Sequence, residues 1–245
     1  RNLLNQEDLD KNIKGIHKQL SKFLNFDSDN KNSAVLCNNN DWFQYINLID
    51  FIRDTGKYIT VNYMIAKESV KKRLSKDSTV GMSFIEFSYQ LIQAYDFYHL
   101  FSKKNCLIQM GGSDQWGNIT SGVELIRKKS GEKAYALTCP LITKADGTKF
   151  GKTEDGNVWL DRDKTSPYKF YQYWLNISDA DAKKYIKIFT FYSIDDINEF
   201  IQKHDEAPHQ RFLQNIIAEF LTKLVHSDVD LKNSITASNI LFGKS

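Results

Sequence analysis

The segment at residues 106–127, CLIQMGGSDQWGNITSGVELIR, changes its hydrophobic period halfway along, and this change narrows the possible folds. Its first five residues form an apolar run of strand length, which the double glycine at 111–112 stops at a sharp turn. Ile119, Val123 and Ile126 then recur at helical spacing, which predicts a helix after the turn. Because strands of open α/β sheets end in this way at a ligand crevice, we predict an α/β fold.

Two polar residues, Asp114 and Gln115, follow the double glycine and would lie at that crevice. The aspartate is a fixed acceptor for hydroxyl groups, whereas the glutamine amide both donates and accepts hydrogen bonds. We therefore expect a polar ligand there. The alternative is an ordinary strand-to-helix turn with a solvated Asp-Gln pair.

A second informative segment, residues 84–101, predicts a helix that is mostly apolar but carries one polar stripe. Tyr89, Gln93 and Asp96 lie at i, i+4 and i+7, hence on one helical face. An unpaired buried polar group costs roughly 1–3 kcal/mol, so a buried stripe would need a polar ligand as its partner. The alternative is a face that is exposed to solvent.

The third segment, KADGTKFGKT at residues 144–153, contains three lysines and two glycines. We expect a mobile loop able to wrap anionic oxygens. It is not a Walker loop, because Gly147 lies four residues before Gly151 instead of five. The alternative is a basic surface hairpin.

Hydrophobic periodicity predicts further elements before residue 164. We expect a long amphipathic helix at residues 1–26 and helical segments at 41–56 and 60–73. We also expect a short strand at 34–37 and another at 136–143, whose proline confines it to an edge or a strand end.

No strand is apparent after residue 164, where the composition changes. Pro167 and Pro208 are expected to open two helices, and Ser193 to cap another. We therefore predict two domains: an α/β part at residues 1–164 and an all-α helical domain at residues 165–245.

The composition excludes several classes of protein. With 245 residues, of which 41% are hydrophobic, the chain can bury a sizeable core. No apolar run approaches the ~18 residues of a membrane span, so we expect a soluble, cytoplasmic protein without a membrane partner. Three dispersed cysteines predict a reducing compartment and no structural zinc. The net charge of +3 is too small for a dedicated nucleic-acid-binding domain, although a local basic patch is still possible.

Three motifs occur in order along the chain: SYQLIQAYDF at 88–97, GGSDQWGNIT at 111–120 and KADGTKFGKT at 144–153. Together they resemble the bacterial-type tyrosyl-tRNA synthetases, which are class I enzymes, and the likeness covers nearly the whole chain. The resemblance implies a partial Rossmann-like nucleotide-binding fold with parallel strands and a dimer-interface insertion. An all-α helical domain that contacts the anticodon or stem would follow.

The resemblance also implies how tyrosine is bound. Tyr89 and Gln93 would hold the α-amino group, and Asp96 would accept a hydrogen bond from the phenol. Gln115 would orient the tyrosyl carboxylate.

For the nucleotide, the resemblance assigns the adenylate ribose to Asp114, with the Gly112 backbone close by. Residues 149–153 resemble this family's form of the K-M-S-K-S loop. Lys149, Lys152 and Thr153 would then contact the departing pyrophosphate as catalytic residues.

The implied function is that of a tyrosine–tRNA ligase, which activates tyrosine with ATP and transfers it to tRNA(Tyr). Mg²⁺ would accompany ATP, no protein-bound metal is expected, and the resemblance implies a homodimer with residues 50–73 at the interface. One alternative is an inactive fragment or paralogue that binds tyrosine or RNA. Another is a related tryptophanyl enzyme, which Asp96 disfavours because a carboxylate suits a phenol better than an indole.

The chain departs from the family in three respects. The H-I-G-H signature does not occur in these 245 residues, nor does the preceding strand or the small C-terminal RNA-binding domain. We therefore expect this chain to be the middle of the enzyme and to be incomplete for catalysis alone.

Overall fold

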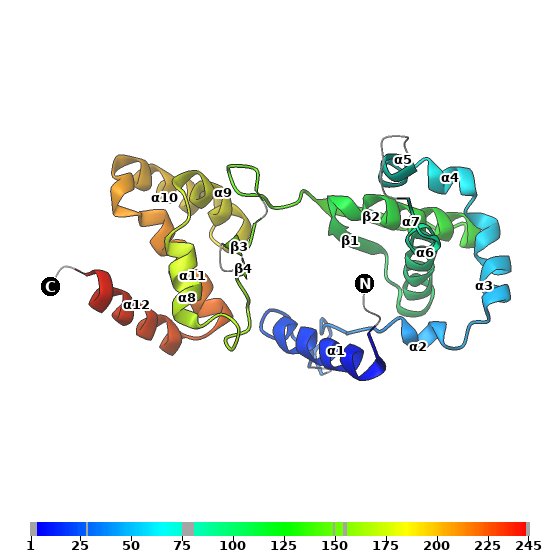
Figure 1. Ribbon diagram of the computed structural model, residues 1–245, viewed down its shortest axis with the longest axis horizontal. Coiled ribbons are helices and arrows are strands. Elements are labelled where there is room, and N and C mark those ends of the chain that lie inside the picture. Colours follow the sequence, from blue (N-terminus) through cyan, green and yellow to red (C-terminus); the bar gives the residue numbers. More distant parts are fainter. Residues whose placement is uncertain (1–3, 28, 75–80, 149, 154–155, 244–245) are drawn as a thin grey trace. The chain divides into compact units, whose positions relative to one another are not determined.

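The computed structural model describes residues 4–27, 29–74, 81–148, 150–153 and 156–243 (Figure 1). Contacts divide the chain into two compact units. Residues 37–141 form one, here called the sheet unit, and residues 1–36 together with 142–245 form the other, here called the helical unit. Residues 142–164 thus pack with the helices that follow them. The boundary between the two units therefore lies at residues 141–142, whereas the change in composition lies at residue 164.

The sheet unit is built on a parallel strand pair, β1 (Ile108–Gly112) and β2 (Tyr135–Cys139). Ile108 pairs with Tyr135, and the register continues to Gly112 opposite Cys139. The crossover between the strands is α7 (Trp116–Ser130), so the expected α/β fold with parallel strands is confirmed. The glycines at 111–112 do not stop the strand as expected; they are its last two residues, because the ladder with β2 extends through them.

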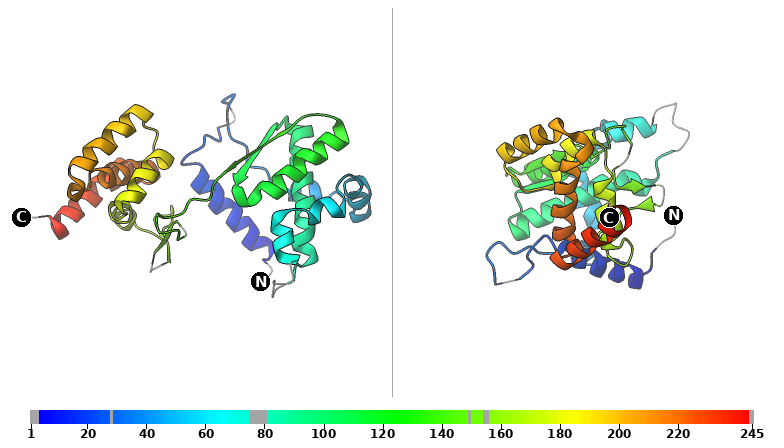
Figure 2. Two further views of the ribbon diagram at one scale, coloured as in Figure 1. Left: turned by 90° about the horizontal axis from the view of Figure 1, so that it is seen from above. Right: turned by 90° about the vertical axis from the view of Figure 1, so that its left-hand side faces the viewer.

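Helix α6 (Phe84–Lys104) packs against α7, and both lie beside the strands (Figures 1 and 2). A capping box between Ser83 and Glu86 begins α6, and Asn105 ends it in the left-handed conformation. The two helices approach so closely that a Cβ at Gly122 would lie 2.8 Å from a ring carbon of Phe97. In the core, Ala94 of α6 clusters with Leu125 of α7, and Phe97 of α6 clusters with Ile126 of α7.

Short helices precede α6 in the sheet unit. The expected helical segment at 41–56 is divided into α2 (Asn40–Phe43) and α3 (Leu48–Asp54). The segment at 60–73 is likewise divided into α4 (Val61–Ile65) and α5 (Glu68–Leu74). N-terminal caps explain where α3 and α4 begin. The side chain of Asn47 accepts a hydrogen bond from Ile49 N, and that of Thr60 accepts one from Tyr63 N.

The helical unit contains the other long helices. Each of the helices α8, α9, α10 and α12 begins at a serine whose side chain accepts a hydrogen bond from a backbone N–H three residues later. Pro208 opens a short 3-10 turn instead of a helix, and α11 begins only after Arg211 has adopted a positive φ of 53°. The helices are α1 (Gln6–Leu20), α8 (Pro167–Leu175), α9 (Asp179–Phe189), α10 (Ile194–Glu206), α11 (Phe212–Val225) and α12 (Asp228–Phe242).

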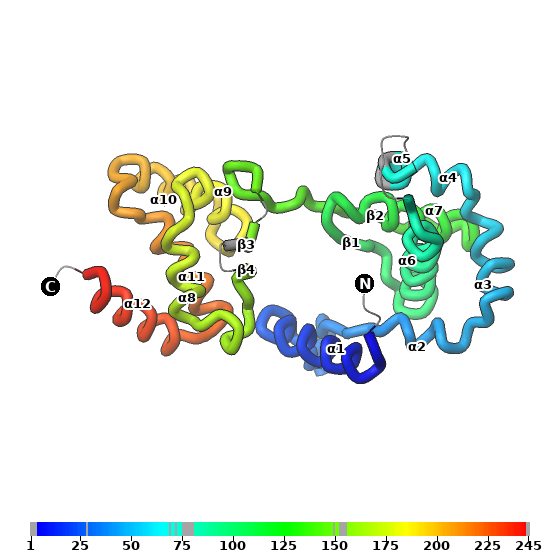
Figure 3. The backbone as a smooth tube through the Cα atoms, in the orientation of Figure 1, coloured from blue at the N-terminus to red at the C-terminus, as the bar shows by residue number. Residues whose placement is uncertain are grey.

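The core of the helical unit is formed mainly by α8, α9 and α11, whose path Figure 3 traces. It is aromatic-rich, and its buried members include Phe170, Tyr171, Trp174, Tyr185, Leu213 and Ile217. Helix α1 begins later and ends earlier than residues 1–26, and Lys22 just beyond it donates hydrogen bonds to Leu160 O and Val225 O. The segment at residues 144–153 ends in the first strand of a small antiparallel hairpin, formed by β3 (Lys152–Thr153) and β4 (Gly156–Asn157).

The strand expected at residues 34–37 is wrong, because these residues lie in irregular structure. Val35 is 70% exposed. A short apolar run becomes a strand only where a neighbouring strand pairs with its backbone, and the described part of the chain supplies none here. Among the described residues, no helix combines the length and the apolar character needed to cross a bilayer.

Candidate active site

The end of β1 carries the first group of candidate residues. Ser113 to Gln115 form a 3-10 turn that leads directly into α7. Gln115 Nε2 donates to Asp114 Oδ2 over 3.0 Å, and Asn118 Nδ2 donates to Gln115 Oε1 over 3.2 Å. This chain of bonds fixes which way the amide of Gln115 faces, while the carboxylate of Asp114 stays exposed.

Both glycines of β1 allow the turn to fold back over the strand end. A Cβ at Gly112 would lie 2.6 Å from Asp114 Oδ1, which is closer than real Cβ contacts. A Cβ at Gly111 would lie 3.2 Å from Gln115 Cβ. The double glycine therefore leaves room for the side chains of Asp114 and Gln115 in the positions that they occupy here.

Helix α6 carries the second group. Gln93 and Asp96 are half-buried on one face, and Tyr89 on the same face is 53% exposed. Asp96 Oδ1 accepts a hydrogen bond from Trp42 Nε1 over 2.9 Å, and Asp96 Oδ2 accepts one from Asn39 Nδ2 over 3.3 Å. Part of the hydrogen-bonding capacity of the polar stripe is thus used within the protein, and Asp96 has lone pairs left for a further donor.

The electrostatics of Asp96 reflect this environment. Burial raises the pKa of the Asp96 carboxyl, and the hydrogen bonds from Trp42 and Asn39 act in the opposite direction. Trp42 is itself held by stacking on His99, with ring centroids 4.4 Å apart. A half-buried carboxylate held by an indole N–H is a directional acceptor for a hydroxyl donor.

Both groups belong to the sheet unit. Only residues 105–107 separate α6 from β1, and Figure 1 shows β1 returning alongside α6. The five residues of β1 span about 16 Å, which matches roughly eleven residues of helix. Convergence of Asp114 and Gln115 with the polar face of α6 stays a prediction.

The third group lies in the helical unit. Lys149 is outside the described residues, and for Lys152 and Thr153 the structure describes the backbone, which forms β3. Upstream of them, Asp146 Oδ1 accepts hydrogen bonds from Thr148 N and Thr148 Oγ1, and these bonds lower the pKa of Asp146. Convergence of this loop with the residues of the sheet unit stays a prediction.

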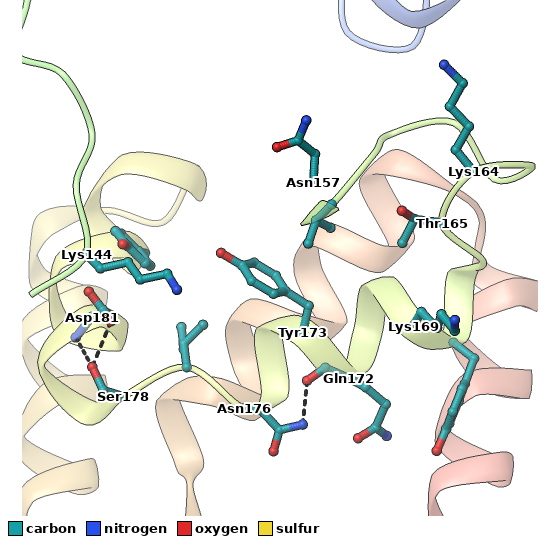
Figure 4. A pocket seen from close by; sticks show the side chains of 14 residues that line it. Lys144, Asn157, Lys164, Thr165, Lys169, Gln172, Tyr173, Asn176, Ser178 and Asp181 are labelled. Atoms are coloured by element: carbon teal, nitrogen blue, oxygen red, sulfur yellow. Dashed lines mark hydrogen bonds between the residues drawn. The ribbon is translucent and has the colours of Figure 1, made fainter. Parts of the chain in front are cut away.

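A cavity of about 530 Å³ lies beside this loop (Figure 4). Its lining includes three lysines, Lys144, Lys164 and Lys169, together with Tyr173. Among the described lining residues, the carboxylate of Asp181 already accepts hydrogen bonds from Ala145 N and Ser178 Oγ. Sequence reasoning missed this cavity, because its residues belong to a loop, a hairpin and two helices that only the fold brings together.

Sequence reasoning also missed the partners of Asp96. Trp42 and Asn39 lie 54 and 57 residues away from Asp96 in sequence, so no periodicity connects them. The available signal was the run of polar residues before Trp42, NNNDW at 38–42, which is unusual beside apolar segments.

The family comparison places this chain, with its parallel strand pair and the polar turn at the end of β1, among the class I aminoacyl-tRNA synthetases. The chain belongs to one family of this class, the tRNA synthetases class I (W and Y), whose family model matches residues 1–243. The resemblance inferred from the three motifs is therefore confirmed.

Individual relatives narrow the comparison. The chain is 61% identical over 247 residues to a tyrosine–tRNA ligase of Flavobacterium johnsoniae and 60% identical over 245 residues to one of Bacteroides fragilis. Both alignments cover all of this chain, and the chain spans 57% of each relative's length. A C-terminally truncated mitochondrial tyrosyl-tRNA synthetase of Aspergillus nidulans is similar in structure, with a TM-score of 0.80 and 28% identity. That alignment covers 99% of this chain and 71% of the other.

Proposed function

We propose that this chain is part of a tyrosine–tRNA ligase that activates tyrosine with ATP and transfers the tyrosyl group to tRNA(Tyr). The observation that carries the proposal is the half-buried carboxylate of Asp96, held between Trp42 and Asn39 on the polar face of α6. A carboxylate in this position suits the hydroxyl of a tyrosine side chain. The high identity to curated tyrosine–tRNA ligases supports the same substrate.

Tyrosine is bound by residues of the sheet unit. Asp96 accepts a hydrogen bond from the phenol, while Tyr89 and Gln93, on the same helical face, hold the α-amino group. Gln115, whose amide is fixed by Asp114 and Asn118, orients the carboxylate. Phenylalanine has no hydroxyl, so its binding would leave the buried carboxylate without a partner. A site of this kind can reject phenylalanine by up to about 10⁵-fold, the factor known for tyrosyl enzymes.

ATP is bound at the end of β1 and by the lysine-rich loop. The exposed carboxylate of Asp114 accepts hydrogen bonds from the ribose hydroxyls, and Gly112 leaves room for it. Lys149, Lys152 and Thr153 contact the pyrophosphate. Mg²⁺ accompanies ATP through its phosphate oxygens, which matches the ion's preference for phosphate and water ligands.

The chemistry requires little acid–base catalysis. An oxygen of the tyrosine carboxylate attacks the α-phosphorus of ATP, the bond to the β-phosphate oxygen breaks, and pyrophosphate leaves with the electron pair. A terminal ribose hydroxyl of tRNA(Tyr) then attacks the tyrosyl carbonyl and AMP leaves. The protein contributes by positioning the reactants and by stabilising charge on the leaving group.

We further propose a homodimer in the cytoplasm, with the interface at residues 50–73. Apolar side chains of α3 and α4 are exposed there and at the preceding residues, as a dimer interface requires. Leu48 and Ile49 are each 68% exposed, and Ile52 and Val61 are 53% and 58% exposed. Sedimentation of the full-length protein at micromolar concentration measures this directly, and a monomer would contradict it.

The proposed activity is tested by tyrosine-dependent exchange of pyrophosphate into ATP with the full-length protein. We expect exchange with tyrosine and none with phenylalanine at equal concentration. Absence of exchange at saturating tyrosine and ATP would favour the alternative, an inactive paralogue that binds tyrosine or RNA. Calorimetric titration with tyrosine and with tRNA would then identify which ligand it binds.

A further inference from the structure

The beginning of the lysine-rich loop is bonded to one helix, α9. Ala145 N donates to Asp181 Oδ1 over 2.7 Å, and Asp181 is almost fully buried. Thr143 O accepts hydrogen bonds from Lys184 Nζ over 2.7 Å and from the Tyr185 hydroxyl over 3.1 Å. The chain therefore enters the loop from a fixed position on the helical unit.

Within the loop, the ring of Phe150 lies among aromatic side chains of α8 and α9. It is stacked on Phe189 with centroids 5.1 Å apart, and it makes an edge contact with Tyr185 at 5.0 Å. Trp174 and Tyr173 complete the surroundings at 5.7 and 6.4 Å. Aromatic pairs in such geometries stabilise beyond the burial of their area.

The end of the loop is bonded as well. Val158 N donates to Gly151 O over 3.0 Å, and the Gly151 backbone also hydrogen-bonds the Tyr173 hydroxyl. Gly151 has a φ of 77°, a conformation that favours glycine and turns the chain immediately after Phe150. The loop thus has bonds at both ends and an aromatic contact in its middle, all within the helical unit.

We propose that Phe150 is a positioning residue, which fixes the loop by inserting its ring among Tyr173, Trp174, Tyr185 and Phe189. This inference rests on the proposed function, in which the neighbouring lysines stabilise the departing pyrophosphate. Phe150 touches no substrate; it acts through the loop backbone on either side. Because a displacement of about 1 Å can reduce a rate by about 100-fold, the ring contributes to catalysis from outside the site.

The test compares Phe150→Ala with Phe191→Ala in the full-length protein. Phe191 belongs to the same unit but is 82% exposed, so it is a matched control for loss of a phenyl ring. We expect Phe150→Ala to lower kcat of pyrophosphate exchange by about 10- to 100-fold and to leave KM for tyrosine within about 2-fold, since the proposed tyrosine contacts lie in the sheet unit. Phe150→Met, which keeps a flexible apolar side chain, should retain kcat within about 3-fold.

A second measurement needs no activity. Hydrogen exchange of the Val158 amide, which is bonded to Gly151 O, should become faster in Phe150→Ala and stay unchanged in Phe191→Ala. Unchanged exchange, or a kcat of Phe150→Ala equal to that of the wild type, would overturn the positioning role. A wild-type protein without pyrophosphate exchange would instead refute the proposed function, and the amide result would still decide whether Phe150 holds the loop.

Discussion

The indole Nε1 of Trp42 donates a hydrogen bond to Oδ1 of Asp96 over 2.9 Å, and so links the short helix α2 to the polar face of α6. Replacing Trp42 by Phe removes the donor and keeps most of the apolar volume. Loss of a hydrogen bond to a charged group amounts to roughly 1.5–3 kcal/mol, so we expect tyrosine affinity to fall about 10- to 100-fold. Calorimetric titration with tyrosine measures this, with Trp159→Phe in the helical unit as the control.

The variant Asp96→Asn tests the role of the Asp96 charge in the stability of the fold and in tyrosine binding. Burial raises the pKa of Asp96 in the folded state, so its ionised form is disfavoured in the fold and its contribution to stability is lost as pH rises through the folded pKa. The free energy of unfolding of the wild type should therefore fall as the pH rises from 3, below the ordinary pKa of an aspartate, to 7, and this part of the pH dependence should be absent from the asparagine variant. Urea unfolding of both proteins at pH 3 and pH 7 measures the effect, and tyrosine binding at pH 7 should fall at least about 10-fold. Equal changes in the free energy of unfolding between the two pH values would contradict the assigned burial effect.

Gly112→Ala places a methyl group at the end of β1. The added Cβ would meet Asp114 Oδ1 at 2.6 Å, so the carboxylate must move. We expect KM for ATP in the exchange reaction to rise by about 10-fold, the equivalent of one hydrogen bond of about 1.4 kcal/mol, with KM for tyrosine little changed. Gly15→Ala in α1 is the control, because an added Cβ there has no neighbour within 4 Å. Equal KM values for ATP in both variants would contradict the role of Asp114.

Gly122→Ala tests the packing of α6 on α7. The added Cβ would lie 2.8 and 2.9 Å from atoms of Phe97, which is itself fully buried. Overpacking in a core of this kind lowers the free energy of unfolding by about 1–3 kcal/mol. Urea denaturation of the variant beside the wild type provides the measurement, and an unchanged midpoint would show that the helices can separate at little cost.

Local pattern was enough to predict the elements that carry the site. The period of α7, the polar stripe of α6, the cap at Ser193 and the first-turn proline Pro167 depend on residues within a few positions of one another. Pairing between distant segments was not visible in the sequence. Strand β1 includes the double glycine because these residues pair with β2. Residues 34–37 form no strand because no described segment pairs with them.

The same limit applies to the site. The stripe on α6 was predicted from spacing alone, but its partner Trp42 is supplied by a helix 54 residues earlier. Likewise, the loop at 144–153 was predicted to be mobile from its lysines and glycines. Its ring contacts with α8 and α9 depend on helices whose packing faces the sequence did not relate to Phe150.

The ammonium group of Lys22 is bonded to the carbonyls of Leu160 and Val225, the latter 203 residues further along the chain. During synthesis, α1 leaves the ribosome long before these carbonyls exist. At about 5–20 residues per second, the first helix waits roughly 10 to 40 s for its docking partners, long enough for the intervening sheet unit to fold by itself. The hydrogen bonds from Lys22 to Leu160 O and Val225 O are therefore formed only after the sheet unit has been synthesised.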